Sequence, residues 1–291
     1  MTKFLLEKGV DVNTRLVLSG EWTPPGIGDV SMTPLHLALT EDKAEIARLL
    51  ITHGAEVHAR DSIGRSPLTV AITYCPSAIE LLLASGVDIN EQTRFGPPLL
   101  AAARYQWLYT AERHIVEREN AVKILLEKGA DPNTRDTEER NALMVMSMEH
   151  RSSGDVYGLG PKRMPPPPTP GRAGRREVAL GELRGLYVKM EPDKALQLIG
   201  EALFRAKCDI NAADSNGRTP LMYAARYGRP TAVKLLLNAG ANVNARDKGG
   251  MTALDLAKQF ANQEIIGLLQ RAGALPGAPK KPGASPAKPA E

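Results

Sequence analysis

The feature that most constrains this chain is a segment that returns every 33 residues. The sequence DSNGRTPL at 214–221 returns as DKGGMTAL at 247–254, and LLNAGA at 236–241 returns as LQRAGA at 269–274. Self-similarity at such a period indicates a chain built from stacked units, because one unit of this length is too small to bury its own apolar faces.

Each unit is predicted to hold a tight turn followed by two antiparallel helices. Asp and Gly favour the turn, and Thr219 caps a helix whose first position is Pro220. Apolar residues then recur with helical spacing, at Leu221, Ala224 and Ala225 in the first helix and at Val233, Leu236 and Leu237 in the second. Gly240 ends the second helix, since glycine tolerates a positive φ.

These motifs resemble the ankyrin repeat, and their fullest form is TPLHLA at 33–38. The helix start, the Leu-Leu pair and the ending of the Gly-Ala-Asp-x-Asn type all match that family's pattern. After a partial first unit we identify six more, at 31–60, 61–93, 94–135, 136–213, 214–246 and 247–274. The resemblance implies an all-α solenoid of helix-turn-helix units with short β-hairpin tips, forming an ankyrin-repeat domain over residues 1–274.

Insertions interrupt this expected array at 14–30, 105–120 and 149–192. The first is either a lengthened hairpin finger or an irregular loop, and the second is either a longer helix pair or an exposed aromatic knob. The third contains KRMPPPPTPGRAGRR at 162–176, whose prolines favour polyproline II, and then an amphipathic helix predicted at 178–190. The tail, 275–291, consists mostly of Pro, Ala, Gly and Lys and is predicted to be disordered.

Composition and motifs argue against an enzyme. We find no phosphate-binding loop, no nucleophile elbow and no His-Glu-x-x-His motif. Neither Cys75 nor Cys208 belongs to a metal-binding pattern, and the five histidines are scattered. We therefore predict no catalytic residue, no cofactor, no metal and no small-molecule substrate.

Two single residues have structural interpretations. Cys75, which stands where the family has glycine between the helices, is expected to be a buried and inert thiol. The family resemblance implies that His36 makes a structural hydrogen bond to a neighbouring turn.

The aspartates of the repeated turn, which are Asp61, Asp136, Asp214 and Asp247, are expected to accept hydrogen bonds from backbone amides.

An aromatic residue recurs at one position near the end of the first helix, at Tyr74, Tyr105, Tyr227 and Phe260. Only 4% of the chain is aromatic, so this recurrence argues against chance. Tyrosine and arginine also dominate the energetics of protein interfaces. The predicted partner-binding residues are Arg65, Tyr74, Arg94, Phe95, Arg104, Tyr105, Arg218, Arg226, Tyr227, Lys248, Met251 and Phe260. The alternative is that the rings only pack between adjacent first helices.

The sequence therefore predicts a protein-interaction scaffold whose concave face, made by the tips and the first helices, binds an acidic or polar-aromatic protein surface. The formal net charge of +4 is too small to indicate nucleic acid, and no apolar run is long enough to span a membrane. With no signal peptide at the N-terminus, the expected compartment is the cytoplasm.

Two alternatives to the scaffold stay open. The chain begins inside a second helix, at FLL in positions 4–6, so its first repeat lacks a first helix. This favours a regulatory ankyrin segment cut from a longer enzyme or effector. The other alternative is binding of nucleic acid or an anionic membrane through the basic insert at 162–176 and the tail lysines Lys280 and Lys281.

Overall fold

A computed structural model describes residues 9–18, 30–94, 96–104, 113–148 and 192–277. These residues fall into two compact units. The N-terminal unit lies within Met1–Asp131 and His150–Ala202, and the C-terminal unit lies within Pro132–Glu149 and Leu203–Glu291. Each unit is described by itself below.

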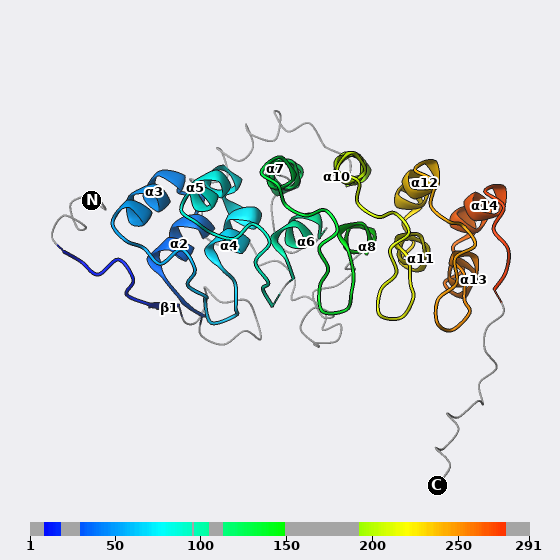
Figure 1. Cartoon of the computed structure of the whole chain (residues 1–291), viewed down its shortest axis with the longest axis horizontal. Coiled ribbons are helices and arrows are strands. Elements are labelled where there is room, and N and C mark those ends of the chain that lie inside the picture. Colours follow the sequence, from blue (N-terminus) through cyan, green and yellow to red (C-terminus); the bar gives the residue numbers. More distant parts are fainter. Residues whose placement is uncertain (1–8, 19–29, 95, 105–112, 149–191, 278–291) are drawn as a thin grey trace, which may run out of the picture. The chain divides into compact units, whose positions relative to one another are not determined.

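The N-terminal unit begins with a short antiparallel pair of strands, β1 (Leu16–Leu18) and β2 (Val30–Met32), in which Leu16 is opposite Met32. Three helix pairs follow: α2 (Pro34–Thr40) with α3 (Ala44–Thr52), α4 (Pro67–Tyr74) with the 3-10 turn η2 (Pro76–Ala78) and α5 (Ile79–Ala84), and α6 (Pro98–Ala103) with α7 (Arg113–Glu127). The first helices α2, α4 and α6 form one layer, and α3, α5 and α7 form the other (Figure 1).

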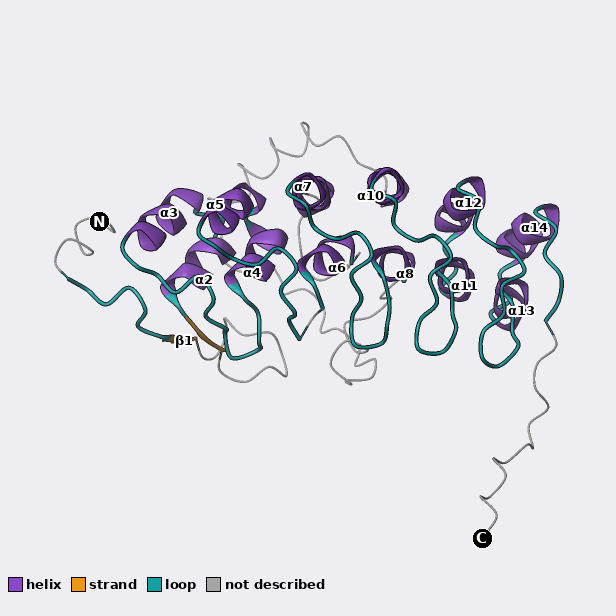
Figure 2. Ribbon diagram, in the orientation of Figure 1, coloured by secondary structure: helices purple, strands orange, loops and turns teal. Residues whose placement is uncertain are grey.

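The C-terminal unit has the same plan. Its helices are α8 (Ala142–Ser147), the end of α10 (Pro192–Arg205), α11 (Pro220–Arg226), α12 (Pro230–Asn238), α13 (Ala253–Gln259) and α14 (Gln263–Arg271). Helix α11 packs against both α8 and α13, while α12 packs against α14. The tips of the turns project from the layer of first helices, away from the second helices (Figures 1 and 2). The expected all-α arrangement of stacked helix pairs is confirmed in both units.

The helix starts are made as the sequence predicts. Thr33, Ser66, Thr219 and Thr252 each have a side-chain oxygen that accepts the backbone N–H three residues later. Proline occupies the first helical position in α2, α4 and α11, where its missing N–H leaves no bond unmade. These caps fix where those four helices begin, and thereby fix the length of the tip before each of them.

Two leucine positions supply much of the core. The leucine that follows the helix-starting proline or its equivalent is buried in every repeat, at Leu35, Leu68, Leu99, Leu143, Leu221 and Leu254. A second set lies two residues before the last residue of each second helix, at Leu50, Leu82, Leu125, Leu203, Leu236 and Leu269. Because both helices of a repeat contribute one such leucine, each helix pair buries its apolar face against its own partner and its neighbour.

The turn aspartates accept backbone amides, as expected. Asp61 Oδ1 accepts the N–H groups of Ile63 (3.1 Å) and Arg65 (2.8 Å). Equivalent pairs of bonds form at Asp136, Asp214 and Asp247. Each carboxylate therefore holds its turn closed and is committed to structure.

Asparagine side chains tie one repeat to the next. The Asn13 side-chain oxygen accepts the backbone N–H of Glu56 (2.9 Å), and that of Asn211 accepts the N–H of Asn242 (2.8 Å). The same bond is made by Asn90 to Asp131, by Asn133 to Asp209 and by Asn244 to Leu275. We call this set the asparagine links.

The last of these links, from Asn244 to Leu275, shows that the repeat pattern continues beyond residue 274, which the sequence analysis gives as the end of the array. Leu275 N–H donates to Asn244 Oδ1 (2.7 Å), and Gly277 N–H donates to Asp255 Oδ2 (2.7 Å). Leu275 thus occupies the place that Asn242 holds one repeat earlier, because 33 residues separate them. The start of the predicted tail is therefore bonded to the last repeat, and 278–291 lie outside the described residues.

The predicted insertions are only partly within the described residues. Strand β1 lies inside the first insertion and β2 begins at its last residue, Val30, while residues 19–29 between them lie outside the described residues. The second insertion ends inside α7, the longest described helix, which begins at Arg113. Residues 105–112 and 149–191 lie outside the described part, and with them lie Tyr105, the basic proline-rich run and the helix predicted at 178–190.

Replacing Lys207 with glycine is expected to stabilise the protein by about 0.5–1 kcal/mol. Lys207 is exposed and has a φ of 63°, in the left-handed region, at a position where the matching residue in the neighbouring repeat is Gly240. Glycine relieves the strain that a side chain causes in this conformation. Part of that gain is offset because glycine also increases the conformational entropy of the unfolded chain. Urea denaturation measures the change. Lys207→Ala, which keeps a Cβ, should give no comparable gain, and an equal gain would contradict the backbone explanation.

Candidate interaction surface

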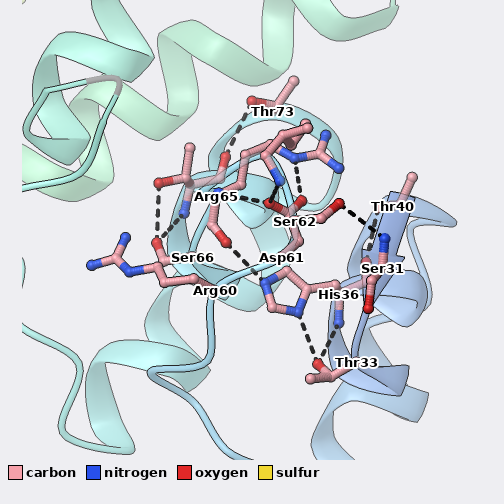
Figure 3. A network of polar contacts seen from close by, with 12 residues as sticks. Ser31, Thr33, His36, Thr40, Arg60, Asp61, Ser62, Arg65, Ser66 and Thr73 are labelled. Carbon is pink, nitrogen blue, oxygen red and sulfur yellow. Dashed lines mark hydrogen bonds and ion pairs between the residues drawn. The ribbon is translucent and has the colours of Figure 1, made fainter. Parts of the chain in front are cut away.

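A buried polar network joins the first two complete repeats, and it shows what His36 does (Figure 3). His36 Nδ1 lies 2.8 Å from the hydroxyl of Thr33, and its Nε2 lies 3.0 Å from the backbone oxygen of Arg65 in the next repeat. Burial lowers the pKa of His36 below its ordinary value of 6.5. The ring is therefore a neutral structural bridge between turns, which confirms the role that the family resemblance implied.

The same network accounts for Arg65, the first of the predicted contact residues. Its Nε donates to Asp61 Oδ2 at 2.7 Å, and 19% of its side chain is exposed (Figure 3). Arg140 is held in the same way by Asp136, at 2.8 Å from Nε. In these two repeats the arginine at the tip is therefore part of the turn.

The remaining predicted contacts of the N-terminal unit are spread over its first helices and tips. Tyr74 is the half-buried last residue of α4, and Arg104 is the half-buried residue that ends α6. Arg94 is exposed beside Gly64 of the preceding tip. Phe95 and Tyr105 lie outside the described residues.

Three of the predicted residues are brought together in the C-terminal unit. The guanidinium carbon of Arg226 lies 5.9 Å from the centre of the Tyr227 ring and 5.7 Å from the centre of the Phe260 ring, which comes from the next repeat. Tyr227 stacks in turn on Tyr223, with ring centres 6.2 Å apart and planes within 3°. We call these four residues, Tyr223, Arg226, Tyr227 and Phe260, the Arg226 cluster.

The rings of the cluster differ in how far they are buried. Tyr223 is buried in a small core with Met144 and Ala212, and the half-buried Tyr227 packs against that core. Phe260, by contrast, has 50% of its surface exposed. The packing alternative therefore fits Tyr227 in part, whereas Phe260 offers an open apolar surface.

Tyr223 is the member of the cluster that was missed at the sequence level. Its hydroxyl donates to Asp214 Oδ2 at 2.7 Å, and burial together with this bond raises its pKa above the ordinary value. The sequence feature that could have identified Tyr223 is its spacing from Tyr227, since rings four residues apart on a helix are neighbours. The bond fixes the ring on which the rest of the cluster is stacked.

The bond from Tyr223 also changes what Arg218 does. In the two earlier repeats the equivalent arginine bonds the second oxygen of its own turn aspartate. Here that oxygen is taken by Tyr223, and Arg218 Nε lies instead 3.7 Å from Asp247 Oδ2 of the next turn. Its side chain is 30% exposed, against 15% for Arg140. Tyr223 thus takes the place at the turn aspartate that the equivalent arginine occupies in the two earlier repeats.

The two remaining predicted residues lie at the tip of the last repeat. Lys248 is exposed, and its backbone N–H donates to the oxygen of Asn216 (2.9 Å), which joins the two tips. Met251 is half-buried, with its N–H held by Asp247 Oδ1 (2.9 Å). Both residues therefore have backbones fixed by the turn.

The other chemistry-bearing groups are committed to structure or widely spaced. Cys75 and Cys208 are free and buried, and burial raises the pKa of the Cys75 thiol, which agrees with the inert role expected for it. Within the described residues, no three His, Cys, Asp or Glu side chains gather as a metal site would need. No helix in the same part of the chain has the length and apolar character to cross a membrane.

The helix pairs, capped turns and buried leucines define a repeat protein, and comparison with known sequences identifies the class. A family model described as ankyrin repeats (3 copies) matches residues 1–93 and 192–278, which is more than half of the chain. The chain belongs to the ankyrin-repeat family.

Several curated proteins are similar over part of their length. Human Rabankyrin-5 is 35% identical over 91 residues, covering 31% of this chain and 8% of that protein. A putative ankyrin repeat protein of Rickettsia bellii is 34% identical over 105 residues, covering 31% of this chain and 43% of that protein. The B-cell lymphoma 3 protein homolog of Mus musculus is 31% identical over 134 residues, covering 45% of this chain and 28% of that protein. The matches thus span less than half of each relative.

These relatives support a general role in protein–protein interaction. Ankyrin repeats are typically interaction modules without enzymatic activity of their own.

Proposed function

We propose that this chain is a protein-interaction scaffold, and that it binds its partner on the face made by the turn tips and first helices of the C-terminal unit. The observation that carries the proposal is the Arg226 cluster, in which the guanidinium lies 5.9 Å from the centre of one ring and 5.7 Å from that of another, Phe260, which is 50% exposed. Arginine and aromatic residues are the side chains that most often dominate binding energy at interfaces.

The buried side of the cluster is held in place by hydrogen bonds, as a binding surface requires. Tyr223 is held by Asp214, and that carboxylate also accepts the N–H groups of Asn216 (2.8 Å) and Arg218 (2.7 Å). A surface fixed before binding loses little conformational entropy when the partner arrives. In the same proposal, residues 1–274 form the interaction domain, with insertions at 14–30, 105–120 and 149–192, and the protein acts in the cytoplasm.

Replacing Phe260 with alanine is expected to lower partner capture at least about tenfold while leaving the thermal unfolding midpoint nearly unchanged, because the ring is half exposed. The measurement is a pull-down with the intact tagged chain, followed by identification and quantification of the retained proteins. Leu275→Ala is the matched control, since Leu275 is a 62% exposed apolar residue of the same unit outside the cluster.

The proposal fails if the Phe260→Ala chain retains the same proteins in the same amounts. It also fails if Leu275→Ala reduces capture equally, since loss from either exposed apolar residue would show non-specific adhesion. A large fall in the unfolding midpoint for Phe260→Ala would return this ring to the packing role.

A further inference from the structure

We infer that the segment recognised by the Arg226 cluster is an acidic peptide of another protein, one of whose carboxylates pairs with Arg226. This inference rests on the proposed function and adds the chemistry of the partner. The juxtaposition behind it is a guanidinium flanked by two rings, Tyr227 and Phe260, with no carboxylate of the described residues paired to it.

The charges around the cluster are unbalanced. Between residues 214 and 260 the chain has seven basic residues and three acidic ones, which are Asp214, Asp247 and Asp255. Each of the three carboxylates accepts backbone N–H groups of its own turn or helix start, as Asp255 does from Thr252 (2.9 Å). The acids of this region are thus used internally. Among the seven bases, Lys234 pairs with Glu264 at 3.0 Å and Arg229 is buried, whereas Arg246, Lys248 and Lys258 are exposed.

Two further cations stand at the tips of the same two repeats. Arg218 has been displaced from Asp214 by Tyr223, and its Nε lies 3.7 Å from Asp247, too far for a hydrogen bond. Lys248 is exposed on the next tip. A peptide with several acidic residues would therefore meet more than one positive group on this face.

The flanking rings favour a peptide carboxylate over a simple anion. Arginine recognises a carboxylate with two parallel N–H donors, and stacking on aromatic faces orients the planar group for that contact. Phe260, exposed and apolar, suits the aliphatic stem of a glutamate or a neighbouring apolar side chain of the peptide. The modest net charge of +4 argues against nucleic acid, which becomes an outcome of the test.

The test is a selection of displayed random 12-residue peptides on the intact chain, carried out in parallel on Arg226→Gln and Arg271→Gln. Arg271 is an exposed arginine on the second helix α14, so its replacement removes the same charge from the same unit but from the other helix layer. The expected result is a set of peptides enriched in Asp and Glu for the wild-type chain and for Arg271→Gln. That enrichment should be lost for Arg226→Gln.

The selected acidic peptide should then bind Arg226→Gln about 10-fold to 100-fold more weakly than the wild-type chain, as expected for the loss of a charge-assisted bond. Arg226→Lys should also weaken it, because lysine keeps the charge but not the planar pair of donors. Replacing the acids of the peptide by Asn and Gln should abolish binding, and added salt should weaken it.

Several outcomes would overturn the inference. These are selection of peptides without acidic enrichment, selection of none above background, equal loss with Arg271→Gln, or tighter binding of a labelled single-stranded oligonucleotide than of the peptide. If Phe260→Ala still abolishes capture in the pull-down while the selection yields neutral peptides, the proposed function stands and the acidic partner is wrong. If both experiments fail, the surface itself is not a binding site.

Discussion

Replacing Leu236 with alanine is expected to lower the free energy of unfolding by about 2–5 kcal/mol. Leu236 is fully buried in α12, at the position where every repeat places a leucine against its neighbours. The loss combines the transfer of the removed methyl and methylene groups with the cavity that they leave. Denaturation in urea, followed by circular dichroism, measures it.

The matched control for Leu236 is the adjacent Leu237, which is only half-buried in the same helix. Leu237→Ala makes the same chemical change with the same loss of side-chain volume, and it is expected to cost roughly half as much or less, because it removes less apolar contact. Equal losses at the two positions, or a loss below about 1 kcal/mol at Leu236, would be inconsistent with the stacked core.

Replacing Asp61 with alanine should cost about 2–3 kcal/mol, the second-largest effect that we expect. The carboxylate is buried and accepts three donors, which are the N–H groups of Ile63 and Arg65 and the Nε of Arg65. Its removal leaves the Arg65 guanidinium without its anion and opens the turn that presents the Arg65 oxygen to His36. Thermal and urea unfolding measure the change.

Asp88 provides the comparison for Asp61. It is exposed, and its Oδ1 accepts the N–H of Asn90 (2.9 Å). Asp88→Ala is expected to cost less than about 1 kcal/mol, since water replaces the lost carboxylate. A cost at Asp61 no larger than at Asp88 would show that the turn network adds little to stability.

The fold was predictable because its signals are local. Thr219 and Pro220 specify a helix start within two adjacent residues, and the 33-residue period aligns that start with Thr252. The buried leucines follow from helical spacing alone. The insertion at 149–192 has no such period, and its prolines specify backbone conformation but no packing partner, so its place in the fold could not be derived.

The candidate site was predictable in part. Recurrence indicated that Tyr227 and Phe260 occupy the same position in successive repeats, and Arg226 precedes one of them. The competition between Tyr223 and Arg218 for Asp214 was not visible, because it depends on which side chain reaches the second carboxylate oxygen. Aliphatic residues such as Leu37 and Leu256 fill the position of Tyr223 in other repeats, so the period offered no precedent.

The asparagine links have a consequence for how such a chain can change. In each link one repeat supplies an asparagine side chain and the next supplies only backbone groups, an N–H in every case and also a backbone oxygen opposite Asn13 and Asn244. The residues that donate these N–H groups are accordingly dissimilar: Glu56, Asp131, Asp209, Asn242 and Leu275. Every residue except proline has a backbone N–H to donate. The side chain at the donating position can therefore change in charge and size while the hydrogen bond between the repeats is kept. Substitutions at these positions therefore change the surface at the edge of each repeat while its hydrogen bond to the preceding repeat is kept.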